Sequence, residues 1–311
     1  MTSPSPGSNV PPVSVSLSVV AHVRATLSAQ LVRISTSTTA YWQRSIGIAS
    51  ILSQSETSDT LDEQAAASRH AQRLGLSLPA LVRMRRGQTE IDTRPNKALD
   101  PDVLSRLLAD YPLVQELVSI ARFGIKPSWL VKLPPTRRPP KNHKSAALFH
   151  PALRRSIRQG QFSGTYLVLD QSLLRRLPSI QCSPLGAVEK NGVDPSVEIR
   201  PIHDLSFPEG SSTNDYLDID SVPVVSYTSV TAIARRIEYV ARANPGIEVK
   251  IMKGDVKSAF RHLMVHADHV HWMGATIPDD KALVIDLAAP FGWPGSPSYY
   301  AAFGRAISWL V

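Results

Sequence analysis

The stretch that most constrains this chain is 247–263, because its hydrophobic period changes part-way along it. Over 247–254 (IEVKIMKG), apolar and polar side chains alternate, which predicts a half-buried strand. Over 255–263 (DVKSAFRHL), apolar side chains recur at three- and four-residue spacing, which predicts a short helix. Asp255 lies at the junction, where a carboxylate can either hold a divalent metal ion or cap the helix. This stretch by itself leaves both interpretations open.

The rest of the chain divides by composition into successive parts. Residues 1–60 begin with a Ser- and Pro-rich run, and we expect a largely flexible segment with one helix. Helical spacing predicts a helical region over 61–125, in which Asp100 precedes Pro101 as a helix cap. Residues 126–160 are predicted to be a basic, Pro-rich linker. Residues 161–311 hold most of the predicted strands and form the last domain.

Charge and cysteine content limit the kind of protein this can be. There are 34 Lys and Arg against 26 Asp and Glu, a net charge of +8 that favours a polyanionic partner. The one cysteine, Cys182, excludes an internal disulfide and fits a reducing compartment. No apolar run of membrane-spanning length and no secretory signal occurs. We therefore expect an intracellular protein, nuclear or cytoplasmic, that is not secreted and has no membrane partner.

The positive charge gathers between Glu116 and Asp170, where no acidic residue occurs. The Pro-rich part, 133–144, is predicted to be extended and exposed, which suits contact with a phosphate backbone. A solvated linker is the alternative that the same charges allow. The candidate nucleic-acid-binding residues in this segment are Arg137, Arg138, Lys141, Lys144, Arg154, Arg155 and Arg158.

Residues 183–205 have the layout of a β-hairpin, with a turn at Asn191-Gly192. Lys190 lies at the tip of the first arm and Arg200 on the returning arm. An ammonium and a guanidinium placed in this way can converge on a triphosphate. Ordinary surface charge on an exposed hairpin explains the same two residues.

Two other clusters have no predicted catalytic role. Asp279-Asp280 follows a proline between two strand-like runs, 269–277 and 281–287, which predicts a hairpin turn. Four histidines lie close together in sequence, but no Cys or Glu accompanies them at the spacing of a zinc site. We predict no metal site at these histidines, which are His262, His266, His269 and His271.

Three segments in order, 183–214 (SPLGAVEK…IRPIHDLSFPEGSSTN), 253–263 (KGDVKSAFRHL) and 289–300 (APFGWPGSPSYY), resemble the fingers and palm of reverse transcriptases. The best likeness is to retrotransposons of the DIRS type. The resemblance implies an α+β fold in which a helical N-terminal region precedes hairpin-based fingers and an incomplete palm of antiparallel sheet backed by helices. It also implies RNA-directed DNA polymerisation with Mg²⁺, deoxynucleoside triphosphates and an RNA or DNA template–primer.

The resemblance gives roles to individual residues. It makes Asp255 the first metal-binding, catalytic aspartate and Phe260 the aromatic ring that excludes a 2′-hydroxyl. The remaining nucleotide-binding residues that it implies are Lys190 and Arg200 at the phosphates, Val256 through its carbonyl, and Phe291 and Gly292 in the loop under the nascent base pair.

One feature departs from the family pattern. A Tyr-x-Asp-Asp motif is expected after the helix that follows Gly292, and none occurs up to Val311. Two-metal nucleotidyl transfer needs more than one carboxylate. We therefore expect a truncated polymerase region that is catalytically incomplete. The alternative is a non-enzymatic, nucleic-acid-binding remnant of a retroelement.

Overall fold

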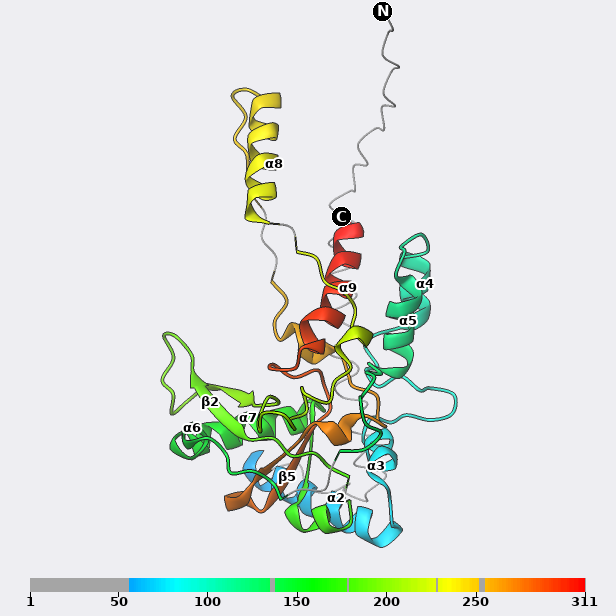
Figure 1. The fold of residues 1–311 in the computed structure, drawn as a ribbon, viewed down its shortest axis with the longest axis vertical. Helices are drawn as coiled ribbons and strands as arrows, with labels where there is room; N and C mark the ends of the chain where they lie inside the picture. The colour runs from blue at the N-terminus through cyan, green and yellow to red at the C-terminus, as the bar shows by residue number, and fades with distance from the viewer. Residues whose placement is uncertain (1–55, 135–137, 178, 228, 252–254, 311) are drawn as a thin grey trace, which may run out of the picture.

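The computed structural model describes residues 56–134, 138–177, 179–227, 229–251 and 255–310 (Figure 1). These residues form helices and two small antiparallel sheets, so the predicted α+β class is confirmed. Nearly all of the predicted N-terminal segment, 1–60, lies outside them. None of the helices in the described ranges is long and apolar enough to span a membrane.

The larger sheet has three antiparallel strands in the order β1 (Tyr166–Asp170), β5 (Ala282–Asp286) and β4 (Gly274–Ile277). Its central strand, β5, is buried along its whole length. The strand predicted over 269–277 begins only at β4, because a short 3₁₀-helix, η4 (Val270–Trp272), precedes it. Asp279 and Asp280 lie in a 3₁₀ turn, η5 (Pro278–Asp280), between the two strands, as predicted.

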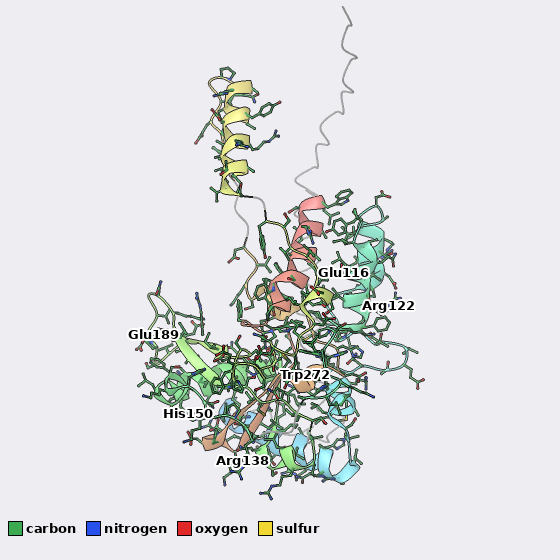
Figure 2. All side chains as sticks on the ribbon, in the orientation of Figure 1. Glu116, Arg122, Arg138, His150, Glu189 and Trp272 are labelled. Carbon is green, nitrogen blue, oxygen red and sulfur yellow. The ribbon has the colours of Figure 1, made fainter. Side chains whose placement is uncertain are left out.

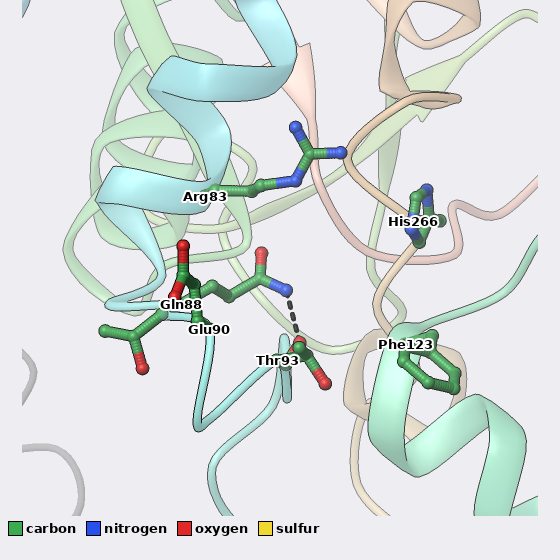
Figure 3. Close-up of a pocket in the computed structure, with 7 residues that line it drawn as sticks. Arg83, Gln88, Glu90, Thr93, Phe123 and His266 are labelled. Carbon is green, nitrogen blue, oxygen red and sulfur yellow. Dashed lines mark hydrogen bonds between the residues drawn. The ribbon is translucent and has the colours of Figure 1, made fainter.

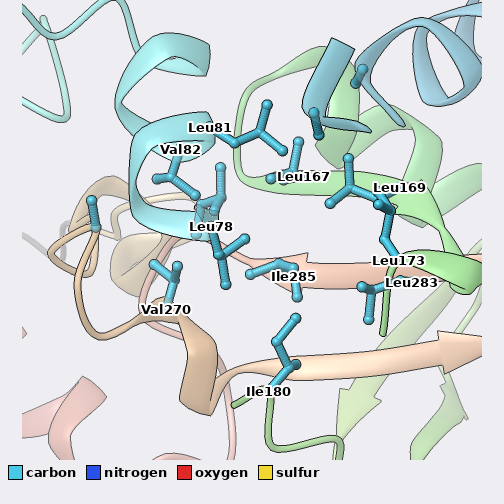
Figure 4. Close-up of a cluster of buried hydrophobic side chains, with 14 of the residues drawn as sticks. Leu78, Leu81, Val82, Leu167, Leu169, Leu173, Ile180, Val270, Leu283 and Ile285 are labelled. Atoms are coloured by element: carbon cyan, nitrogen blue, oxygen red, sulfur yellow. The ribbon is translucent and has the colours of Figure 1, made fainter. Parts of the chain in front are cut away.

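The helices α2 (Glu56–Leu74) and α3 (Leu78–Arg85) cover one face of this sheet (Figure 4). Strand side chains alternate between faces, so β1 and β5 present one set of apolar residues to these helices. The shared cluster includes Ala67, Leu78, Leu81, Val82, Leu167, Leu169, Leu283 and Ile285. Arg86, at the end of α3, is also buried and donates through Nη2 to the carbonyls of Val265 and Leu287, both at 2.8 Å. The start of the expected helical region therefore belongs to the same core as the sheet.

The opposite face is covered by α6 (Lys144–Leu148), α7 (His150–Phe162) and the hairpin of β2 (Leu185–Glu189) and β3 (Ile199–His203). The two helices correct the prediction of a linker over 126–160. Ala152, Leu153 and Ile157 recur at helical spacing in α7 and are buried against the sheet. Burial of this apolar stripe keeps the second half of the segment folded. Of the Pro-rich part, 133–144, the described residues 133–134 and 138–143 contain no helix or strand, whereas Lys144 begins α6.

A second group of helices comprises α4 (Pro101–Leu107), α5 (Val114–Phe123) and α9 (Gly295–Trp309), which share an apolar cluster. Asp100 caps α4 as predicted, since its Oδ1 accepts from the backbone N–H groups of Asp102 at 2.9 Å and Val103 at 3.1 Å. After α5, Gly124 has φ +86°, and a Cβ there would lie 2.8 Å from the carbonyl oxygen of Met264. Only glycine allows this close approach between α5 and the chain before the sheet.

The strand predicted over 247–254 is wrong for the residues that the structure describes. Residues 247–251 follow α8 (Val230–Ala243) without any strand pairing and are mostly exposed (Figure 1). Alternating side chains favour a strand only when another strand supplies backbone partners, and no described strand lies alongside. The helical turn predicted from residue 255 forms later, as the 3₁₀-helix η3 (Ala259–His262).

Candidate functional site

The hairpin that carries the two candidate phosphate-binding cations forms as predicted. Strands β2 and β3 pair antiparallel, with Val188 opposite Arg200. Arg200 is exposed, and the described residues offer it no ion pair. Lys190 lies just beyond β2, but its Nζ already pairs with the carboxylate of Glu198 across the hairpin. This bond lowers the pKa of Glu198, so Lys190 must exchange one anion for another to bind phosphate.

The loop that follows β5 meets the base of this hairpin. Gly292 has φ +94°, and a Cβ there would lie 3.0 Å from the carbonyl oxygen of His203, the last residue of β3. Asn214 donates through Nδ2 to the carbonyl of Gly292 at 2.9 Å. Ser296, fully buried, donates through Oγ to the carbonyl of Pro290 at 2.6 Å. The loop is therefore held at both ends, against the hairpin and against the start of α9.

Aromatic side chains gather next to this loop. The rings of Phe260 and Phe291 lie 5.0 Å apart, and those of Phe260 and Tyr300 lie 5.8 Å apart. Phe291 is 55% exposed, so its ring borders solvent. Asp255 is exposed. Burial raises the pKa of Tyr300, and the negative charge of Asp255 raises it further. Asp255, Phe260 and Phe291 thus lie in one neighbourhood, around Tyr300.

Arg261 fixes the turn that carries Phe260. Its Nη1 donates to Oδ1 of Asp286 at 2.6 Å, and its guanidinium lies 4.7 Å from the centre of the Tyr166 ring. Asp286 is buried in β5, and burial raises its pKa to about 6 despite the nearby guanidinium. This ion pair was not predicted, because its partners are 25 residues apart and no spacing rule connects them. It ties η3 to the central strand of the sheet.

The described residues do not gather the ligands of a metal centre. No group of three His, Cys, Asp or Glu side chains placed to hold a metal ion occurs in the described ranges. Asp255 itself is exposed. Among the clustered histidines, His269 accepts a hydrogen bond through Nδ1 from Trp129 Nε1 at 3.0 Å. Burial lowers the pKa of His266 and of His271 to about 4, so both rings are neutral near pH 7.

The basic segment separates into exposed and engaged residues (Figure 2). Arg138, Lys141 and Lys144 are exposed, whereas Arg137 lies outside the described residues. Arg154 Nε lies 3.4 Å from Oδ2 of Asp280, and Arg155 donates to the carbonyl of Val197 at 3.1 Å.

The structure corrects the prediction that Arg158 lies on this basic surface. Arg158 is buried in α7, where Nη2 donates to Oε1 of Gln64 at 2.6 Å and Nη1 to Oε1 of Gln161 at 2.9 Å. Its guanidinium joins α7 to α2. Residue spacing alone did not show that this face of α7 turns inward.

A separate cavity of about 380 Å³ lies beyond the end of α3 (Figure 3). It is lined by Arg83, Gln88, Thr89, Glu90, Thr93, Phe123 and His266. Arg83 is already paired with Asp268 at 2.5 Å. None of the predicted site residues lines this cavity.

No protein-family model matches the chain, and no curated protein matches it. Among solved structures, a foamy viral protease–reverse transcriptase in complex with double-stranded DNA is similar, with a TM-score of 0.37 and 14% identity. The match covers 65% of this chain and 34% of the viral chain, so the chain spans about a third of that protein's length. This likeness is too distant to assign a family.

Proposed function

We propose that this chain forms the nucleotide-binding and template-binding part of a reverse-transcriptase-type (RNA-directed DNA) polymerase. The observation that supports this most is the meeting of the three segments that resemble reverse transcriptases. The hairpin and the loop after β5 meet where Gly292 approaches His203. The same loop meets η3 through Phe291 and Phe260, whose rings are 5.0 Å apart.

The chemistry offered by these segments suits a deoxynucleoside triphosphate. Arg200 can bind phosphate oxygens through two parallel N–H groups, and Lys190 adds a point charge once it leaves Glu198. The exposed ring of Phe291 can contact a nucleoside, and Phe260 beside it can exclude a 2′-hydroxyl by steric conflict. Val256, which follows Asp255, contributes its main-chain carbonyl in this proposal.

Magnesium enters this proposal only together with the nucleotide. Mg²⁺ in proteins is commonly held by one or two carboxylates and by the phosphates of the substrate. Asp255 supplies one such carboxylate, and the described residues do not complete a site around it.

The proposal is tested by equilibrium binding of dTTP to the full chain in the presence of Mg²⁺. Arg200→Ala should weaken binding at least about tenfold, because a charge-assisted contact to phosphate contributes roughly 1.5–3 kcal/mol. Arg106→Ala is the matched control, since Arg106 is an exposed arginine of α4 in a different part of the fold. If dTTP bound the wild type and both variants equally, or bound none of them, the proposed nucleotide site would be wrong.

A second candidate function is nucleic-acid binding without catalysis. It is favoured by Arg138, Lys141 and Lys144, which are exposed and have no ion-pair partner among the described residues. Such a protein would bind nucleic acid through its basic segment whether or not dTTP binds. Measuring both ligands on the same preparation separates the two functions.

A further inference from the structure

We infer that Asn214 is a positioning residue that holds the 290–293 loop in place so that Phe291 faces Phe260. This inference rests on the proposed function, because the aromatic pair matters only if a nucleoside binds against it. Asn214 is the last residue of the 183–214 segment, but no charge or hydrophobic period distinguishes it from its neighbours. Its partner in the loop is 78 residues away along the chain.

The contacts of Asn214 join three backbone segments. Its Nδ2 donates to the carbonyl of Gly292 at 2.9 Å and to Oγ of Ser206 at 2.8 Å. Its own backbone N–H donates to the carbonyl of Leu205 at 2.9 Å. Leu205 is buried in a cluster that also contains Trp293 and Tyr299. The backbone of Asn214 is therefore held against a buried segment, and its side chain reaches from there to the 290–293 loop.

The 290–293 loop depends on such contacts for its position. On one side, Ser296 holds the carbonyl of Pro290. On the other side, the buried ring of Trp293 stacks on Tyr299 with centroids 5.8 Å apart. Phe291 lies between these anchors and is 55% exposed, so core packing does not fix its ring. The backbone on either side has to do so, and the carbonyl that follows Phe291 in the chain, that of Gly292, is the one that Asn214 holds.

This contact also connects the two halves of the proposed nucleotide site. Leu205 and Ser206 follow β3, the strand that carries Arg200. Phe291 contacts Phe260, on the turn anchored by Arg261 and Asp286. Asn214 thus sets the distance between the residues proposed for the phosphates and those proposed for the nucleoside. Its loss should affect nucleoside recognition while leaving triphosphate recognition intact.

The test uses the full chain and the near-isosteric change Asn214→Asp. A carboxylate cannot donate to the Gly292 carbonyl, so this change removes the hydrogen bond and adds little change in volume. The matched control is Asn142→Ala. Asn142 lies at the base of the same hairpin, but it makes its hydrogen bonds away from the 290–293 loop, donating to the carbonyl of Thr276 at 2.8 Å and accepting from the N–H of Leu185 at 2.9 Å.

Two measurements separate positioning from general stability. The first is chymotrypsin cleavage after Phe291, which should be about fivefold faster in Asn214→Asp, because one hydrogen bond restrains the loop. The second compares dTTP with inorganic tripolyphosphate. Binding of dTTP should weaken about fivefold, with tripolyphosphate binding unchanged. Asn142→Ala should leave the cleavage rate after Phe291 as in the wild type.

Each outcome bears on the inference. An unchanged rate of cleavage after Phe291 in Asn214→Asp would show that Asn214 does not hold the 290–293 loop. Equal losses of affinity for dTTP and for tripolyphosphate would overturn its positioning role. If the wild type bound no dTTP, the proposed function would fail, while faster cleavage in Asn214→Asp would still show that Asn214 holds the 290–293 loop. If Asn214→Asp melted far below the wild type, Asn214→Ala would replace it, since it removes the same donor without adding a charge, and it should give the same two results.

Discussion

At the scale of single residues, Lys190 is held by Glu198, its cross-strand neighbour. We predict that Glu198→Gln strengthens dTTP binding about twofold, because an exposed ion pair competes only weakly with phosphate. Isothermal titration of dTTP at constant salt measures the change. Glu248→Gln is the matched control, since Glu248 forms an exposed pair with Lys250 at 3.3 Å. Equal affinity in both variants would show that Lys190 does not contact the nucleotide.

His203 gives a prediction about pH. Its Nε2 lies 2.9 Å from the Gly274 carbonyl, and burial lowers its pKa to about 4. In the unfolded chain this histidine titrates near pH 6.5, so between pH 6.5 and 4 the unfolded state binds a proton that the folded state does not bind. Stability from neutral His203 is complete above about pH 6.5. This stability falls as the pH drops from 6.5 through 4, by at most about 1.4 kcal/mol per pH unit.

The variant His203→Gln removes this titration. We expect it to be less stable than the wild type at pH 7, because a buried contact is disturbed, and to show a flatter loss of stability between pH 6.5 and 4. Urea unfolding at several pH values measures both properties. Parallel pH curves for the two proteins would contradict the assignment of His203 as a buried neutral ring.

At the scale of elements, α3 is a structural part of the sheet layer. Leu81 is 1% exposed and lies in the cluster with residues of β1 and β5. We predict that Leu81→Ala lowers the free energy of unfolding by about 2–5 kcal/mol, through lost burial and a residual cavity. Leu107→Ala, at a side chain of α4 that is 53% exposed, should cost about 0.5 kcal/mol or less.

The same experiment tests whether α2 and α3 fold with the sheet. Their shared core predicts one cooperative transition, at which the far-ultraviolet circular dichroism and the tryptophan fluorescence, to which the buried Trp272 contributes, change together. A separate, earlier transition that leaves the sheet intact would contradict this prediction.

At the scale of the whole molecule, we predict that the exposed basic segment sets the affinity for nucleic acid. Replacement of Arg138, Lys141 and Lys144 by Ala should weaken binding to single-stranded DNA and RNA, and it should reduce the salt slope by about 2, at roughly 0.7 per phosphate contact. The control is a triple Ala variant of Arg69, Arg73 and Arg175, which are exposed elsewhere in the fold. If the two triple variants behaved alike, the binding would reflect net charge and not this segment.

A further prediction concerns catalysis by this chain. Two cations close together need several anionic oxygens around them, and the described residues contain no group of three or more side chains placed to hold a metal ion. We expect no primer extension with saturating Mg²⁺ and deoxynucleotides. Gel-based extension assays with Asp255→Asn as the reference measure this. Extension by the wild type that Asp255→Asn abolishes would contradict the prediction.

Local sequence signals predicted the elements that depend on neighbouring residues. The Asn191-Gly192 turn and the alternation around it gave the hairpin, and Asp100 gave the start of α4. Turn chemistry and capping act over a few residues, so they can be read without knowledge of the fold. The segments carrying Lys190, Arg200, Asp255, Phe260 and Phe291 were identified through the resemblance of their motifs to those of reverse transcriptases.

What the sequence by itself determined was therefore which segments carry candidate chemistry and most of the local elements. Tertiary structure alone decided which of these residues are free to act. It turned Arg158 inward, paired Arg261 with Asp286, and placed Asn214 on Gly292. It also left 247–251 without a strand partner. These outcomes depend on burial and on hydrogen-bond partners far away along the chain, which neither spacing nor composition encodes.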